Sequence, residues 1–375
     1  MRKIMVFFLV WGVLLGVLIT TAEASDKLVT VYGSVRMDTW WVDRSKEKAG
    51  GDFDDSDLLW DQDMGSSRFG AKFKTGDIKA QVEIRPRDRD KGNGTQNETL
   101  RQWWGAWNFG KGELLIGQAY VPCYAKISNV SLEGGTIATQ YGDFVSTSRT
   151  PMMQLSFPFS VGTLKMAALK PSDKGADTVV KGTRDTDITL PKFEASFDFK
   201  FGPASMMVFG GYNTTDEVDT STDREYSIDS HVIGLNARVN LGPAYLKGII
   251  YTAQNQKNYG TEKDWVWNAY YDAASDSITD IDAMGWFLVA GCKVSDMLSV
   301  EAGYGQRKLK RERPGFDKDE DKNAMFYINM PITVAKGFTI TPEIEYYDEK
   351  DQKIAGVSKD QGNTTYYGVY WRIDF

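Results

Sequence analysis

The sequence predicts an all-β protein that crosses a membrane as an antiparallel β-barrel of sixteen strands. Three features of the chain point to this fold. Apolar and polar residues alternate along most of its length, very short connections alternate strictly with long polar ones, and the chain stops on an aromatic residue at the end of its last alternating segment. No apolar stripe with helical spacing competes over a comparable length.

The composition excludes several classes of protein. The chain has 375 residues with 44 basic and 51 acidic side chains, and its net charge of −7 argues against a nucleic-acid partner. Aromatic residues make up 13% of the chain, which is far from the composition of a disordered protein. One His and two Cys leave little for a metal site, a disulfide framework or His-dependent catalysis. We therefore expect no enzymatic activity, no cofactor and no bound metal.

The amino terminus has the pattern of a secretory signal peptide. Arg2 and Lys3 precede an apolar run over residues 4–19, and Ala22 and Ala24 form a small-residue cleavage site. The sequence thus predicts a signal peptide over residues 1–24 and a single barrel domain over residues 25–375. The alternative is an uncleaved anchor helix, for which the apolar run is short. No later segment approaches the roughly 20 apolar residues of a membrane-spanning helix, so any crossing must use strands.

Alternation with a period of two begins directly after the predicted cleavage site. Val29, Val31 and Val35 occupy odd positions, while Ser34 and Arg36 occupy even ones. Residues 68–74 and 78–85 repeat this pattern of one apolar and one charged face. Each segment is therefore expected to be a strand with one face toward lipid and the other toward water.

The spacing of the connections predicts the number of strands. Seven short connections are rich in turn-forming residues, and eight long polar stretches alternate with them. The short ones are 76–77, 110–112, 158–162, 202–203, 242–243, 295–297 and 335–337, and the long ones are 43–64, 88–98, 120–148, 172–189, 214–227, 254–279, 309–321 and 348–362. Fifteen connections join sixteen strands, with short periplasmic turns and long extracellular loops.

A soluble all-β protein is the competing interpretation, because a sandwich or β-helix also alternates apolar and polar residues. Lipid offers no hydrogen-bond partner to a backbone N–H, so a sheet within a membrane must close on itself. The asymmetry between turns and loops, the signal peptide and the aromatic content together favour the closed membrane barrel. Cys123 and Cys292 are expected to remain free thiols, because their predicted positions are too far apart for a disulfide.

The last alternating strand ends at the final residue of the chain. Tyr367, Val369, Trp371, Ile373 and Phe375 share one face of this strand. A terminal Phe on such a strand resembles the sorting signal that the outer-membrane assembly machinery reads. We therefore expect that machinery to be a partner of this chain.

The whole layout resembles the Gram-negative general porin family of sixteen-stranded, trimeric outer-membrane proteins. Short sequence words carry the resemblance: Val31-Tyr32-Gly33, Ser67-Arg68-Phe69-Gly70-Ala71-Lys72, and Leu115-Ile116-Gly117-Gln118, in which Gln118 stands where the family usually has Arg. The third loop has Ser131-Leu132-Glu133-Gly134-Gly135, which retains the acid and the paired glycines of the family but not its Pro and Phe.

The resemblance implies that the third loop, roughly residues 120–148, folds into the lumen and narrows it. Glu133 is the first candidate for an acid on that loop and Asp143 the second. The family pattern places wall bases at Arg68 and Arg101, and strand parity and position add Arg36, Arg85 and Arg149. These seven residues are the predicted pore constriction. A loop acid facing basic wall residues would set up a transverse field that polar solutes tolerate better than apolar ones.

The function implied is an outer-membrane channel for passive diffusion of small hydrophilic solutes and ions. Its expected partners are those solutes, outer-membrane lipid, lipopolysaccharide and two further copies of the chain in a homotrimer. One alternative is a channel selective for organic acids or other small anions, which several arginines in the lumen would suit. A barrel enzyme is disfavoured because His231 stands alone, and a closed structural or adhesive barrel is a further alternative.

Overall fold

The computed structural model describes residues 28–50, 55–63, 65–86, 100–135, 137–143, 149–176, 184–219, 223–260, 267–272, 275–312 and 317–375, with only the backbone described at 133–134. The predicted signal peptide lies outside these residues.

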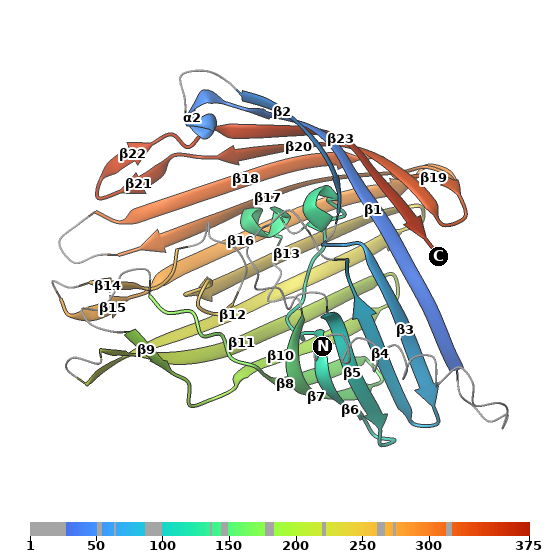
Figure 1. Ribbon diagram of the computed structural model, residues 1–375, viewed down its shortest axis with the longest axis horizontal. Helices are drawn as coiled ribbons and strands as arrows, with labels where there is room; N and C mark the ends of the chain where they lie inside the picture. The colour runs from blue at the N-terminus through green and yellow to red at the C-terminus, as the bar shows by residue number, and fades with distance from the viewer. Residues whose placement is uncertain are drawn as a thin grey trace, which may run out of the picture.

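The described chain forms a closed antiparallel barrel of sixteen wall strands (Figure 1). Three wall strands are interrupted and are therefore written as two segments each. In chain order the wall consists of β1 (Leu28–Arg44), β2 (Asp55–Gln62) with β3 (Arg68–Thr75), β4 (Ile78–Ile84), β5 (Leu100–Asn108), β6 (Glu113–Tyr120), β7 (Arg149–Phe159), β8 (Gly162–Leu169), β9 (Arg184–Asp187) with β10 (Lys192–Phe201), β11 (Ala204–Asp219), β12 (Arg224–Leu241), β13 (Ala244–Gln254), β16 (Ile281–Lys293), β17 (Ser299–Arg311), β18 (Asp319–Asn329) with β19 (Ile332–Ala335), β20 (Phe338–Glu349) and β23 (Asn363–Asp374).

The remaining elements lie in the connections. A short helix, α2 (Lys46–Ala49), follows β1, and the 3₁₀ turns η1 (Leu132–Gly135) and η2 (Ile137–Tyr141) lie in the third loop. Two small hairpins are β14 (Tyr270–Asp272) with β15 (Ser277–Thr279), and β21 (Gln352–Ile354) with β22 (Val357–Lys359). None of the helices among the described residues is long and apolar enough to span a membrane.

The barrel closes where the first strand meets the last. β1 pairs with β23 from Ser34 opposite Asp374 to Arg44 opposite Thr364, and its other edge pairs with β2 and β3. Figure 1 shows β1 lying beside β23 along this seam. Because both edges of β1 are paired, the sheet has no free edge at this position, as lipid requires.

The apolar residues at alternate strand positions face outward, as the sequence predicts. Val29, Val31 and Trp41 on β1 are about half exposed on the outer face, whereas Asp38 and Trp40 are buried. Along the last strand, four of the five predicted outer residues are exposed, from 36% at Trp371 to 68% at Phe375, and Val369 is half-buried. A soluble sandwich would bury these apolar faces against each other, so the membrane barrel is the correct fold.

All seven predicted turns are confirmed. The strand pairs meet at them within two to five residues, and five of the turns contain a Gly with φ between 53° and 87°. This left-handed backbone region disfavours side chains with a Cβ, which explains the glycines that mark the turns in the sequence. These five are Gly76, Gly110, Gly202, Gly242 and Gly337.

Several predicted loops are shorter than expected. β11 and β12 continue through most of 214–227, and β17 and β18 extend into 309–321. His231 lies within β12. The first part of the 214–227 stretch, residues 214–219, is almost entirely polar and therefore resembles a loop in sequence. In β12 the alternation continues, with Tyr226 and Ile228 buried and Ser227 exposed, but only two apolar residues mark it.

Gly368 permits the close pairing at the seam, which provides a test of the fold. A Cβ at this position would overlap the carbonyl oxygen of Thr39 and lie 2.7 Å from the Cα of Trp40. We expect Gly368→Ala to destabilise the barrel by about 1–3 kcal/mol, the usual cost of overpacking. The measurement is the temperature at which the folded band is lost in an SDS gel.

Gly105→Ala is the matched control, because a Cβ there has no heavy atom within 4 Å. An equal loss of heat resistance in both variants would contradict the role given to Gly368.

Candidate functional site

The third loop lies against the inner surface of the barrel wall. Its 3₁₀ turn η2 contacts β16, β17 and β18, and the two short turns appear inside the barrel outline in Figure 1. Most of its described residues between 121 and 143 are buried. The loop therefore occupies part of the lumen.

Carboxylates of the wall hold the backbone of this loop. Glu301 on β17 accepts hydrogen bonds from the backbone N–H and the side-chain amide of Asn129, at 2.8 and 2.7 Å. Glu343 on β20 accepts one from the backbone N–H of Ser131 at 3.1 Å. These hydrogen bonds fix the loop backbone to the wall.

A lysine completes this attachment. Lys247 on β13 donates to the carbonyl oxygen of Ile127 at 2.7 Å and forms an ion pair with Glu301 at 2.9 Å. Nearby, Gly142 has φ of +104°, and a Cβ there would lie 2.5 Å from the carbonyl oxygen of Gln306. Only glycine fits this close approach of the loop to β17.

Asp143 has a different position from the one expected of a pore-facing acid. Its carboxylate is fully buried and accepts hydrogen bonds from the backbone N–H groups of Ile127 and Ser128, at 2.9 and 3.1 Å, and from the Ser128 hydroxyl at 2.5 Å. Burial raises the pKa of this carboxyl, while the charge of Lys126 and these hydrogen bonds oppose the rise. Asp143 thus joins two parts of the loop and does not face open lumen.

The other predicted loop acid, Glu133, belongs to η1, but its side chain is outside the described residues. Lys126 lies on the described part of the loop, and the charges that act on it most strongly are the carboxylates of Asp143, Glu343 and Glu345, with Arg36 contributing less.

Four of the five predicted arginines come from β1, β3, β5 and β7, which belong to one continuous stretch of the wall. Arg101 donates to Glu83 at 2.7 Å, and Arg68 lies 3.7 Å from the same carboxylate. The hydroxyl of Tyr32 also donates to Glu83, at 2.8 Å. A single carboxylate on β4 therefore organises two of the arginines.

Arg36 is held by the first strand and the last. Its Nε donates to the hydroxyl of Ser34 at 2.9 Å, and a terminal nitrogen contacts the hydroxyl of Tyr370 at 3.4 Å. Tyr370 in turn donates to Asp63 at 2.8 Å. Arg85 is half-buried just beyond the end of β4.

Arg149 differs from the other four predicted arginines because one of its terminal nitrogens is buried without a hydrogen-bond partner among the described residues. Its guanidinium carbon lies 5.5 Å from the ring centroid of Tyr120, whose ring packs at 4.6 Å from that of Tyr124. The charges of Arg149 and Arg101 lie close enough to repel each other. This unmet donor beside a second guanidinium is suited to an anion.

The sequence predicted the arginines but not most of the acids that organise the site. Glu83 was visible as a polar position of its alternating strand, and parity alone suggests that it faces the lumen. The roles of Glu301 and Glu343 had no local signal, because their partners lie about 170 and 210 residues away along the chain.

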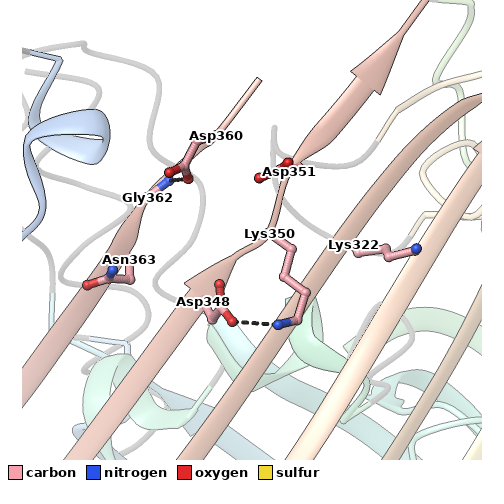
Figure 2. A pocket seen from close by; sticks show the side chains of 7 residues that line it. All are labelled: Lys322, Asp348, Lys350, Asp351, Asp360, Gly362 and Asn363. Carbon is pink, nitrogen blue, oxygen red and sulfur yellow. Dashed lines mark hydrogen bonds and ion pairs between the residues drawn. The ribbon is translucent and has the colours of Figure 1, made fainter. Parts of the chain in front are cut away.

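A separate hollow of about 500 Å³ lies at the ends of β18, β20 and β23 (Figure 2). Asp348 and Lys350 form an ion pair within it at 2.7 Å. Both signs of charge line this hollow, so it has no evident preference for anions or cations. Its lining is Lys322, Asp348, Lys350, Asp351, Asp360, Gly362 and Asn363.

The comparisons with known proteins agree with this architecture. The model of the Gram-negative porin family matches residues 13–352, so the chain belongs to that family. The fold is similar to that of the outer-membrane channel DcaP of Acinetobacter baumannii, with a TM-score of 0.68 and 16% identity over 95% of this chain and 99% of that one. The comparison with curated protein sequences finds no significant match.

Two other solved structures share the fold. The anion-selective porin of Comamonas acidovorans has a TM-score of 0.62 and 18% identity, covering 93% of this chain and all of that one. The trimer form of OmpT of Vibrio cholerae has a TM-score of 0.56 and 14% identity, covering 94% and 100%. The family and the barrel together make this chain an integral outer-membrane channel for passive diffusion of small solutes.

Asp143→Asn tests how the loop is held. In the parent protein both carboxylate oxygens of Asp143 accept hydrogen bonds. In the variant an NH₂ group replaces one of these oxygens and cannot accept, so a buried hydrogen bond is lost. We expect a loss of about 1–3 kcal/mol in stability and noisier single-channel current. Thermal unfolding and planar-bilayer recording measure the two effects.

Asp296→Asn is the control, because Asp296 is 97% exposed at a turn, where ion pairs contribute little. Quiet current and unchanged stability in Asp143→Asn would contradict the structural role of this carboxylate.

Proposed function

We propose that the arginines Arg36, Arg68, Arg101 and Arg149 line the narrow part of this channel opposite the third loop. Their placement on one stretch of wall, with the loop held on the other, is the observation that carries the proposal. We propose no catalytic role for the chain, whose single histidine, His231, is exposed on β12.

Water makes this cluster of like charges tolerable. Charges across a hydrated lumen are screened over about 8 Å at physiological salt, whereas a dry core would make such a cluster costly. A polar solute that enters exchanges water for hydrogen bonds to the guanidinium groups. An apolar solute displaces that water and gains no such bonds.

Arg68→Gln tests the proposed lining. Removing one unit charge that acts across ~7 Å of water should raise the cation-to-anion permeability ratio about two- to threefold. The reversal potential across a planar bilayer in a salt gradient measures this ratio.

Lys111→Gln is the charge-matched control, because Lys111 is exposed in the turn between β5 and β6. A reversal potential unchanged by Arg68→Gln would remove Arg68 from the narrow section.

A second candidate function is a preference for small anions such as organic acids. The buried, unpartnered nitrogen of Arg149 favours it, because a guanidinium N–H without an acceptor is costly until an anion or water meets it. Arg101 nearby adds a second positive charge, and the carboxylate of Asp143 is withdrawn into the loop.

Arg149→Gln separates this candidate from unselective diffusion. If a carboxylate binds Arg149, glutarate should reduce the current of the parent channel, and the substitution should weaken that block about tenfold, the effect of one charge-assisted hydrogen bond. Arg149→Lys should give an intermediate block, since it keeps the charge but loses the planar fork. Equal block of all three proteins would exclude the anion site.

We propose that the channel assembles as a homotrimer in contact with lipid and lipopolysaccharide. The OmpT structure in its trimer form supports this assembly, as does the dense apolar outer face of β1 to β5, where Trp60 and Trp103 are 67% and 60% exposed. The exposed ring of Phe375 at the end of the chain supports recognition by the assembly machinery.

Unheated protein in an SDS gel tests the trimer. A band at three times the mass of the heated chain is expected, and chemical crosslinking in intact outer membranes should give the same ladder of one, two and three copies. A single band that remains at the mass of one chain under both treatments would exclude it.

A further inference from the structure

A buried tyrosine from the connection after β13 meets the first residues of the third loop inside the wall. Tyr259 and Cys123 are both 0% exposed. They come from different loops, and the same carboxylate binds both. This carboxylate belongs to Glu194 near the start of β10.

The two oxygens of Glu194 divide their partners between the loops. Oε2 accepts the backbone N–H of Cys123 at 3.0 Å, and Oε1 accepts the hydroxyl of Tyr259 at 2.9 Å. Each loop therefore helps to hold the Glu194 carboxylate in the position in which it binds the other loop.

Lys192 reinforces the junction from the same face of β10. Its Nζ lies 3.0 Å from Oε1 of Glu194, donates to the carbonyl oxygen of Tyr259 at 2.9 Å, and stands 3.6 Å from the centroid of the tyrosine ring. An ion pair this deeply buried is stable only while its remaining hydrogen bonds are satisfied. Withdrawing Tyr259 would remove both the carbonyl oxygen that accepts from Lys192 and the hydroxyl that donates to Glu194.

Gly211 makes room for the tyrosine. It lies opposite Glu194 in the pairing of β10 with β11, and a Cβ on it would overlap the hydroxyl of Tyr259 most severely. The same Cβ would lie 2.9 Å from Cγ of Glu194 and from the carbonyl oxygen of Phe193. The absence of a side chain at this wall position thus matches the insertion of a side chain from a distant loop.

We propose that Tyr259 is a latch that couples the connection after β13 to the third loop through Glu194, so that withdrawal of Tyr259 releases the start of the third loop. The latch is independent of which residues line the narrow section. A displacement of the outer connection is then transmitted to the loop that narrows the pore.

Cys123 provides a native reporter of the latch. Burial raises the pKa of its thiol well above the usual value, and its Sγ donates to the carbonyl oxygen of Gly210 at 3.2 Å. The thiol is therefore both covered and protonated while the latch is closed, and it reacts with a thiol reagent only when the loop opens.

The experiment uses the full channel carrying Cys292→Ser, which leaves Cys123 as the one cysteine. Folded protein is treated with a charged, membrane-impermeant maleimide, and single-channel current is recorded in parallel. We expect Gly211→Ala to expel Tyr259, to speed labelling of Cys123 at least about tenfold and to increase fluctuations of the open current.

Gly210→Ala is the matched control on the adjacent residue. A Cβ there meets nothing closer than the carbonyl oxygen of Val232 at 3.3 Å, so labelling and current should stay as in the parent. Equal acceleration in both glycine variants would mean general loosening of the wall and would overturn the proposal. Faster labelling without a change in current would overturn the coupling to the pore.

Tyr259→Phe keeps the inference testable if Gly211→Ala does not fold. It retains the ring and removes only the hydroxyl that Glu194 accepts. Faster labelling than in the parent is expected, and a rate within about twofold of the parent would overturn the proposal.

Discussion

The need to pair every backbone polar group within lipid governs this structure. A sheet with a free edge would expose N–H and C=O groups that hydrocarbon cannot bind, so the chain must bring its first strand back to its last. The pairing of β1 with β23 meets this need. Once the sheet is closed, the period of two divides every strand into a face toward lipid and a face toward the lumen.

The same constraint shapes the interior, where a long loop also carries backbone groups into a confined space. Glu194, Glu301 and Glu343 of the wall accept N–H groups of the third loop and thereby anchor it. These three carboxylates are thus engaged in holding the loop. On the neighbouring stretch of wall, by contrast, Arg68 and Arg101 share the carboxylate of Glu83.

Much of the fold was predictable because it depends on local signals. Alternation identified the strands, and glycines with positive φ marked turns such as those at Gly76 and Gly242. The prediction failed where local signals weaken: β11 continues through residues 214–219, which are almost all polar, and β12 begins with only two alternating apolar residues, Tyr226 and Ile228. Arg36, Arg68, Arg101 and Arg149 lie on regular strands, whereas Arg85 follows the end of β4.

The sequence by itself determined the barrel, its connectivity and the face that each strand turns inward, because these follow from periodicity and turn chemistry over a few residues. Only the tertiary structure decided which acids meet which loops. Asp143 is withdrawn into its own loop, and Glu194 binds Cys123 and Tyr259, which lie 71 and 65 residues away in the chain. Such contacts depend on how a closed wall folds a loop back on itself, and no short segment of sequence records that geometry.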